Sequence, residues 1–442
     1  MQDASSEPRT ADGVSAQGDG VNAFGDHPLR SLVLDEIHSR PFQPLTSPAQ
    51  LFHFAFMTDA AQAAADRRAV ARLCAENGAP PPAPGAKHHF VRFGELALRW
   101  EQHSEFTTTT FVVEGGAGAS FEAARRLCAP LIADLPQAGP LLVSAALTLG
   151  PEAGAPPLER LLEERSLVAS IVARGGAVAA TDFRLAADGF VHILMRGRVL
   201  SPNRAGSTAQ RLLELETYRT LALLGLPEAQ LCAPRIKRVE DALGAILREM
   251  NVATDPPADH RLLDELTALA AELEADVAAT SYRFGASRAY DGLVQQRLAS
   301  LSEESFGDYP TFAAFLARRM TPAMRTCRIA TERQFDLSKK LGRAANLLRT
   351  RVDVEIERQN RDLLHSMNER TRLQLRLQQT VEGLSVAAIS YYIIGLLGYV
   401  FKGVNELGFG PEPALATAIA VPLVVLVVAL IVKRIRGAHG ER

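Results

Sequence analysis

Residues 384–401 read LSVAAISYYIIGLLGYVF, and residues 414–432 read ALATAIAVPLVVLVVALIV. Neither run contains a charged residue. At about 1.5 Å per helical residue, each run is long enough to reach across the roughly 30 Å hydrocarbon core of a bilayer. Only about a dozen residues separate the two runs. The sequence therefore predicts a two-helix transmembrane hairpin over residues 384–432, with the lipid bilayer as a partner.

Basic residues flank this predicted hairpin on both outer sides. Three arginines lie within residues 370–376, and three basic residues lie within residues 433–436. The connecting loop has one lysine, Lys402, against Glu406 and Glu412. By the positive-inside rule, both ends of the hairpin face the cytoplasm. We therefore expect a multi-pass protein of the bacterial inner membrane whose N-terminus and C-terminus are both cytoplasmic.

Composition narrows the classes of function. The chain has 442 residues, of which 47% are hydrophobic, so it has room for two or three domains with real cores. Its net charge of −2 gives no basic footprint, and we expect no nucleic-acid partner. The four cysteines never form CxxC and suit a reducing cytosol.

Residues 1–26 are predicted to be a disordered tail, and residues 433–442 a basic cytosolic tail.

Residues 27–200 are predicted to form a cytosolic α+β domain with a mainly antiparallel sheet. A first helix begins after Asp26 and ends at Pro41, and further helices are expected over residues 60–77 and 120–129. Strands are expected at Leu51–Met57, His89–Phe93, Leu96–Phe106, Thr108–Glu114, Leu141–Leu147, Leu167–Ala173, Ala177–Leu185 and Phe190–Met195. Ala187-Asp188-Gly189 supplies the last turn.

The clearest alternation of apolar and polar residues is in the strand predicted at Leu96–Phe106. Leu98, Trp100 and Phe106 are expected to point to one side. The other side would carry Arg99, Glu101, His103 and Glu105. This polar row has two readings: a solvated sheet face, which we favour, or a ligand or metal site if a neighbouring strand adds further groups.

Residues 201–330 are predicted to be a helical region, and the chain is expected to be helical from Arg204 to its end. Residues 331–383 are predicted to form a long stalk helix. Apolar residues recur there at three-to-four spacing, at Leu337, Leu341, Ala345, Leu348, Val352, Ile356, Leu363 and Met367. Such a helix cannot bury its stripe alone. We expect it to pack against the helical region or against copies of itself, as a coiled coil in a homo-oligomer.

Other candidate sites are weaker. Asp35, His38 and Arg40 cluster at the end of the first helix, where they could bind a ligand or metal or simply fix the helix end. GGAGA at residues 115–119 is expected to be a plain loop, because no GK[ST] follows it. GxSxG, HExxH, Walker and EF-hand patterns are absent from the sequence. We therefore predict no catalytic or cofactor-binding residues, and a divalent cation is the one cofactor considered.

The first predicted span has a face of small and hydroxylated residues. Ser385, Ala388, Tyr392, Gly395 and Tyr399 share this face at helical spacing. Such residues suit close packing between transmembrane helices, which we favour. The same face would line a pore if several chains assembled around it.

Three segments together resemble a bacterial family of uncharacterised membrane-anchored proteins, a domain of unknown function. They are HPLRSLVLDEIHSRPF at residues 27–42, HHFVRFGELALRWEQHSEFTTTTF at residues 88–111, and LLELETYRTLALLGLP at residues 212–227. The resemblance covers nearly the whole chain after the tail. It implies membrane anchoring and no known activity.

The architecture also resembles the CorA-type magnesium transporters, in which a cytosolic α/β domain precedes a very long helix that becomes the first span. In that family a Gly-Met-Asn motif at the external turn holds a hydrated cation in a pentamer. Here Gly403-Val404-Asn405 follows the first span. Lys402 stands where the family usually has tyrosine, and it would ring the mouth with positive charge.

The function expected from these patterns is a membrane-anchored cytosolic binding or organising module, oligomeric, for an unknown small-molecule or ion ligand. A CorA-like divalent-cation channel or transporter is the alternative, and a metal-dependent enzyme comes third. Binding is favoured over catalysis because no catalytic motif was found.

Overall fold

The computed structural model describes residues 27–30, 33–34, 42–135, 137–252, 256–406, 408 and 412–439. The chain divides into two compact units. The first unit extends to Glu240 and also includes Glu272–Ser338, and the second consists of Asp241–Ala271 and the chain from Lys339 onward. The fold is mixed α+β, as predicted, with a sheet followed by long helices.

The first unit is built on a sheet that has nine strands among the described residues, in the order β2-β3-β4-β1-β5-β8-β7-β6-β9. The strands are β1 (Ala49–Met57), β2 (His88–Phe93), β3 (Leu96–Gln102), β4 (Phe106–Glu114), β5 (Leu141–Pro151), β6 (Val168–Val172), β7 (Ala177–Leu185), β8 (Val191–Gly197) and β9 (Glu304–Ser305). Neighbouring strands run antiparallel except β5 and β8, which are parallel. The predicted, largely antiparallel sheet is therefore confirmed.

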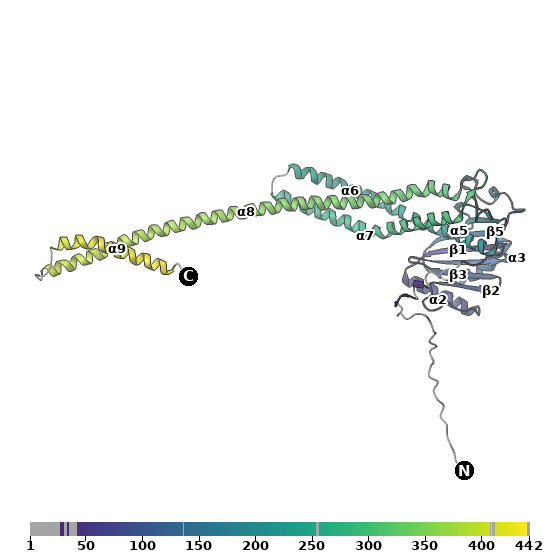
Figure 1. The fold of residues 1–442 in the computed structure, drawn as a ribbon, viewed down its shortest axis with the longest axis horizontal. Coiled ribbons are helices and arrows are strands. Elements are labelled where there is room, and N and C mark those ends of the chain that lie inside the picture. Colours follow the sequence, from purple (N-terminus) through teal and green to yellow (C-terminus); the bar gives the residue numbers. More distant parts are fainter. Residues whose placement is uncertain are drawn as a thin grey trace, which may run out of the picture. The chain divides into compact units, whose positions relative to one another are not determined.

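One face of the sheet packs against α2 (Ala60–Glu76) and α4 (Phe121–Asp134) (Figure 1). Phe52 of β1 and Trp100 of β3 are buried in this core, and the Phe52 ring lies 5.5 Å from that of Phe121. The indole N–H of Trp100 donates a hydrogen bond to the Asp66 carboxylate at 2.8 Å. This face gathers the apolar residues of the alternating strands, so their burial holds the sheet to its two helices.

The opposite face lies under α5 (Pro202–Leu223), and here the prediction of a solvated surface is wrong. Glu101 and Glu105 are only 7% and 8% exposed, respectively. Thr217 of α5 hydrogen-bonds to His53 of β1, and Arg283 reaches Glu105 from α7 (Pro256–Leu301). Strand alternation separates the two faces, but it carries no information about a helix that arrives more than a hundred residues later.

The expected strand at Leu96–Phe106 is in fact shorter. β3 ends at Gln102, residues 103–105 form a turn, and β4 begins at Phe106. Phe106 pairs with Met57 and lies on the α5 side, opposite to Trp100, because the hairpin restarts the alternation. Leu98 and Trp100 are completely buried, as predicted.

Two other expectations need correction. GGAGA is not a plain loop, since residues Gly115–Gly118 form the short helix α3. The chain is not helical throughout after Arg204, because β9 at Glu304–Ser305 pairs with β6. Further helical elements are η1 (Leu158–Arg160), η2 (Glu164–Ser166), α6 (Gly225–Val252), α8 (Phe312–Glu406) and α9 (Pro413–His439).

In the second unit, α8 is buried only in its first part. Leu341 and Leu348 are 1% and 0% exposed, and the Arg351 guanidinium donates to the backbone carbonyl of Met250 in α6 at 2.7 Å. Further along α8, Leu363 and Met367 are 61% and 63% exposed. The predicted stripe is thus covered up to Leu348, half-buried at Val352 and exposed from Ile356 onward.

Two helices are long and apolar enough to cross a membrane. They are α8, whose apolar window is almost entirely exposed, and the part of α9 at Pro413–Arg434. Ser390 of α8 and Val424 and Val428 of α9 are buried, so the two helices pack against each other in a hairpin. These two helices contain the runs from which membrane spans were predicted.

Candidate functional site

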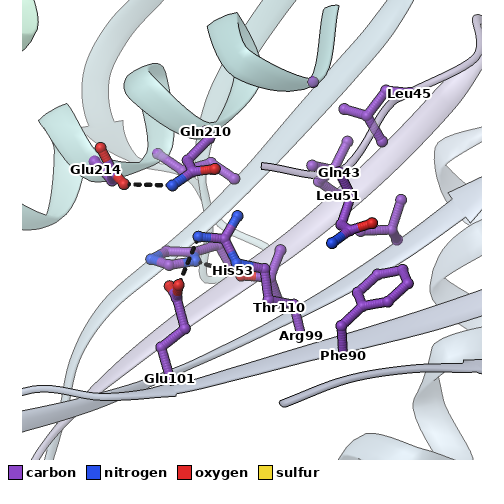
Figure 2. A pocket seen from close by; sticks show the side chains of 13 residues that line it. Gln43, Leu45, Leu51, His53, Phe90, Arg99, Glu101, Thr110, Gln210 and Glu214 are labelled. Carbon is purple, nitrogen blue, oxygen red and sulfur yellow. Dashed lines mark hydrogen bonds and ion pairs between the residues drawn. The ribbon is translucent and has the colours of Figure 1, made fainter. Parts of the chain in front are cut away.

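The candidate site is a polar groove in the first unit, between the sheet and α5 (Figure 2). It consists of two cavities, of about 240 and 40 Å³, that share four lining residues. The shared residues are His53, Glu101, Gln210 and Glu214. The larger cavity is also lined by His103, Phe106, Thr108, Thr217, Tyr218 and Arg297. We call this paired cavity the sheet–helix groove.

The register of the strands places its polar side chains in rows. Arg99 of β3 is opposite Thr110 of β4, which is opposite His53 of β1. Glu101 and Thr108 form the neighbouring row, one pleat along. Because adjacent strands lie about 4.8 Å apart, side chains in a row are close enough to share hydrogen bonds and one ligand.

Helix α5 supplies the opposite wall with residues three or four apart. Gln210, Glu214 and Thr217 fall on the side that faces the sheet. Gly206 brings the backbone of α5 unusually close to the segment before β1, because a Cβ there would lie 1.8 Å from the carbonyl oxygen of Gln43. Any larger residue would push these two backbones apart, and they form one end of the groove.

His53 is buried and linked to both walls. Its Nδ1 lies 2.8 Å from the Thr110 hydroxyl, and its Nε2 lies 3.0 Å from the Thr217 hydroxyl. Thr217 already donates its proton to the carbonyl of Leu213. We therefore assign the proton to Nε2, which donates to Thr217, while Nδ1 accepts from Thr110. Burial lowers the pKa of His53 to about 3, so the ring is neutral at physiological pH.

The charged residues of the sheet–helix groove occur in pairs. Arg99 donates to Glu101 at 2.7 Å, and Arg297 pairs with Glu214. Burial by itself would raise the pKa of Glu101, but the charge and hydrogen bond of Arg99 contribute to a net lowering, so the carboxylate stays ionised. Gln210 donates to the other oxygen of Glu214 at 2.7 Å. The lining thus holds both signs of charge and no large excess of either.

The predicted polar row of β3 is divided between two places. Glu101 and His103 line the larger cavity, and the His103 ring stacks on Phe106 at 4.1 Å. Glu105 instead binds Arg283 through two hydrogen bonds, at 3.1 and 2.7 Å, and accepts another from Tyr282. The row divides because residues 103–105 leave the strand. No group of three His, Cys, Asp or Glu side chains within the described part of the chain could hold a metal ion.

The other predicted candidates do not join this groove. Asp35, His38 and Arg40 lie outside the described residues. Tyr392 and Tyr399 of α8 are 72% and 77% exposed, and Gly395 is exposed on the same side.

The Gly-Val-Asn segment lies within α8, which continues to Glu406. At 100° per residue, Gly403 is within about 40° of Tyr399 around the helix, but Asn405 is about 120° away. The pore candidates therefore do not form a single line along one helix.

The groove residues that were not singled out from sequence include His53, Gln210, Glu214 and Arg297. One signal was present, because His53 is the single polar residue in the run LFHFAFM at 51–57. A buried strand tolerates such a residue only if its hydrogen bonds are satisfied. The helix residues gave no comparable signal, since Gln and Glu three or four apart are ordinary on a solvated helix face.

The sequence was compared with known proteins. Residues 25–439 match the model of the family described as "Protein of unknown function (DUF3422)". The chain belongs to this family. The comparisons with curated proteins and with solved structures gave no match. Membership confirms the resemblance noted for the three quoted segments, and it leaves the activity to be argued from the groove.

Chemically, the groove is better suited to recognition than to acid–base catalysis. Both nitrogens of His53 are engaged, and its pKa of about 3 makes it a poor base at neutral pH. Arg99 and Glu101 offer a cation and an anion on the sheet side, and Gln210 offers an amide from the helix. Together these groups can donate to and accept from a polar molecule.

Proposed function

We propose that this protein is a membrane-anchored module that binds a small polar molecule in the sheet–helix groove. The buried polar wall carries the proposal. Where α2 and α4 cover the sheet, a large apolar cluster fills the core, which is the arrangement that stability favours, and the buried Asp66 carboxylate accepts the Trp100 indole N–H. Under α5, by contrast, the chain places a buried histidine beside two ion pairs, of which Glu101 is buried and Arg99, Glu214 and Arg297 are partly buried. Burying charges usually costs as much as their pairing returns, so a binding role accounts for them better than stability does.

The size and charge of the groove define a class of ligand. Its larger cavity, at about 240 Å³, lies below the roughly 300–1,000 Å³ typical of sites for drug-sized ligands. Across the two cavities, two arginines are paired with two glutamates, so the lining has no net positive charge that would attract a polyanion. The Gln210 side-chain oxygen is buried without a hydrogen-bond partner among the described residues and could accept from a ligand N–H. A free amino acid, which is small and zwitterionic, fits these features.

The proposed location is the bacterial inner membrane. The apolar stretches of α8 and α9 would form the two spans, with the basic residues of 370–376 and 433–436 on the cytoplasmic side. Both ends of the hairpin, and the groove, would then lie in the cytoplasm. This arrangement would expose the groove to cytosolic metabolites.

The proposal is tested by thermal unfolding of the full chain in detergent, with free amino acids and with ATP as separate probes. We expect at least one amino acid, at about 100 times its Kd, to raise the unfolding midpoint by several degrees, and ATP not to do so. Glu101→Gln should abolish this shift. Glu76→Gln, an exposed position on α2, is the matched control and should keep it.

Two results would contradict the proposal. Either no free amino acid changes the midpoint, or the shift persists unchanged in Glu101→Gln. A shift in the midpoint produced by ATP alone would show that the groove prefers a polyanion, which contradicts the balanced charge of its lining.

A further inference from the structure

We infer that α8 helices from separate copies of this chain pack side by side, parallel and in register, through an exposed stripe between Ile356 and Tyr399. This inference does not depend on what the sheet–helix groove binds. The surface lies wholly within the second unit. We call it the α8 stripe.

The α8 stripe runs along the helix and is interrupted between Met367 and Leu377 by Arg370 and Gln374. At 100° per residue, its apolar and small residues fall within a sector about 80° wide. They are Ile356, Leu363, Met367, Leu377, Val381, Ala388, Tyr392, Gly395 and Tyr399. All of them are exposed, the large ones by 47% to 77%. The opposite side of the segment before the first span carries charged and polar residues: Arg358, Asp362, His365, Glu369, Arg372 and Arg376.

The hairpin does not cover this stripe. The α8 residue buried against α9 is Ser390, at 3% exposure, together with Val424 and Val428 of α9. Ser390 lies about 160° around the helix from Tyr392. Helix α9 therefore occupies one side of α8 and leaves the face of Tyr392, Gly395 and Tyr399 free for another helix.

The change of polarity along the stripe identifies its occupant. Lipid can cover the part within the span, but Ile356 is 28 residues before Leu384, about 40 Å along the helix. An occupant of the whole stripe must be a long helix that is amphipathic at first and apolar afterwards. The change from amphipathic to apolar must also occur at the height where the charged residues of α8 end, near Gly383. The α8 of a second copy in the same membrane has this polarity at matching heights, provided that the two run parallel.

The residues within the stripe suit this pairing. Small residues at Ala388 and Gly395 let helix backbones approach closely inside the membrane. Gln374 lies within the stripe and Asn360 at its edge. In a parallel pair each meets its own counterpart and can share a hydrogen bond, a device that sets register in paired helices. Arg370, which lies within the same sector about 20° from its centre, would meet a like charge. It is therefore the weakest point of the interface.

Disulfide cross-linking of the full chain in native membranes tests this surface. Met367→Cys places a thiol on the stripe, and in a parallel, in-register pair it faces itself. His365→Cys is the matched control, because residue 365 is exposed and about 160° away around the same turn. We expect oxidation to give cross-linked dimers with Met367→Cys and only the background of the unsubstituted chain with His365→Cys. Equal cross-linking at the two positions, or none at Met367→Cys, would overturn the inference.

A second measurement uses charge in place of thiols. Leu363→Glu combined with Met367→Glu would bury like charges between copies, and we expect the association of the full chain in detergent to weaken at least about tenfold. His365→Glu should leave association unchanged. Since all three positions are exposed in the single chain, these substitutions leave its own packing intact. An unchanged oligomer mass in the double variant would overturn the inference.

Discussion

The two faces of the β-sheet are both buried, but they differ in chemistry. Under α2 and α4, aromatic and aliphatic side chains surround Trp100, and one hydrogen bond satisfies its indole N–H. Under α5, charged pairs and a neutral histidine surround a cavity. The first face can be explained by stability alone, because apolar burial drives folding. The second calls for another explanation, and ligand binding supplies one.

The largest effect is expected on the apolar face. Trp100→Ala removes a completely buried ring and leaves the Asp66 carboxylate without its donor, so we expect a loss of about 4 kcal/mol in the free energy of unfolding. Urea unfolding of the full chain followed by circular dichroism measures this. A loss below about 1 kcal/mol would show that this face is not the core of the first unit.

A somewhat smaller loss is expected from Glu105→Gln on the other face. This change leaves the Arg283 guanidinium largely buried without its counter-ion, at a cost of about 3 kcal/mol. Adding Arg283→Met should recover part of the loss, because it removes the unpaired charge. A negligible effect of Glu105→Gln would contradict this prediction. It would indicate that this face of the sheet is solvated, as the sequence analysis favoured.

The pH dependence of stability tests whether His53 on the polar face is buried and neutral. The pKa of His53 is about 3 in the folded protein and near 6.5 when unfolded, so only the unfolded chain takes up this proton between those values. Stability from His53 is therefore present above pH 6.5 and is lost as the pH falls toward 3. Between pH 7 and 5 we expect a loss of about 2 kcal/mol that is absent from His53→Asn. Equal pH dependence in both proteins would mean that His53 is accessible to solvent.

The smallest effect is expected in the hairpin, where the alternative function would reside. If the protein is a divalent-cation channel, Asn405→Ala should abolish magnesium uptake into vesicles and Lys402→Ala should raise it. If the polar sheet face carries the function, neither change alters magnesium flux. Uptake that depends on Asn405 would transfer the function from the groove to the membrane segment.

Much of the fold could be predicted from local patterns. Period-two alternation identified β3 and the burial of Leu98 and Trp100, and two uncharged runs identified the apolar helices. The site could not be predicted in the same way. Burial of Glu101 depends on α5, about a hundred residues later in the chain, and no period within β3 encodes that contact. The partners of Glu105 lie still further away, on α7.

The helix wall of the groove was hidden for a different reason. Gln210 and Glu214 have the spacing of a solvated helix face, so their sequence context looks ordinary. The isolated histidine in LFHFAFM was the one usable hint, because a polar group in a buried strand needs a partner. Its partners, Thr110 and Thr217, come from a neighbouring strand and a distant helix.

Hydrogen–deuterium exchange tests the central claim most directly, because it reads both faces of the sheet in one experiment. The full chain in detergent would be compared with and without the free amino acid that gives the largest thermal shift. We predict slower exchange in peptides from β3 and from α5, which form the walls of the groove, and no change in α2 or α4. Protection confined to α2 and α4, or no protection in any peptide, would contradict the assignment of ligand binding to the polar face.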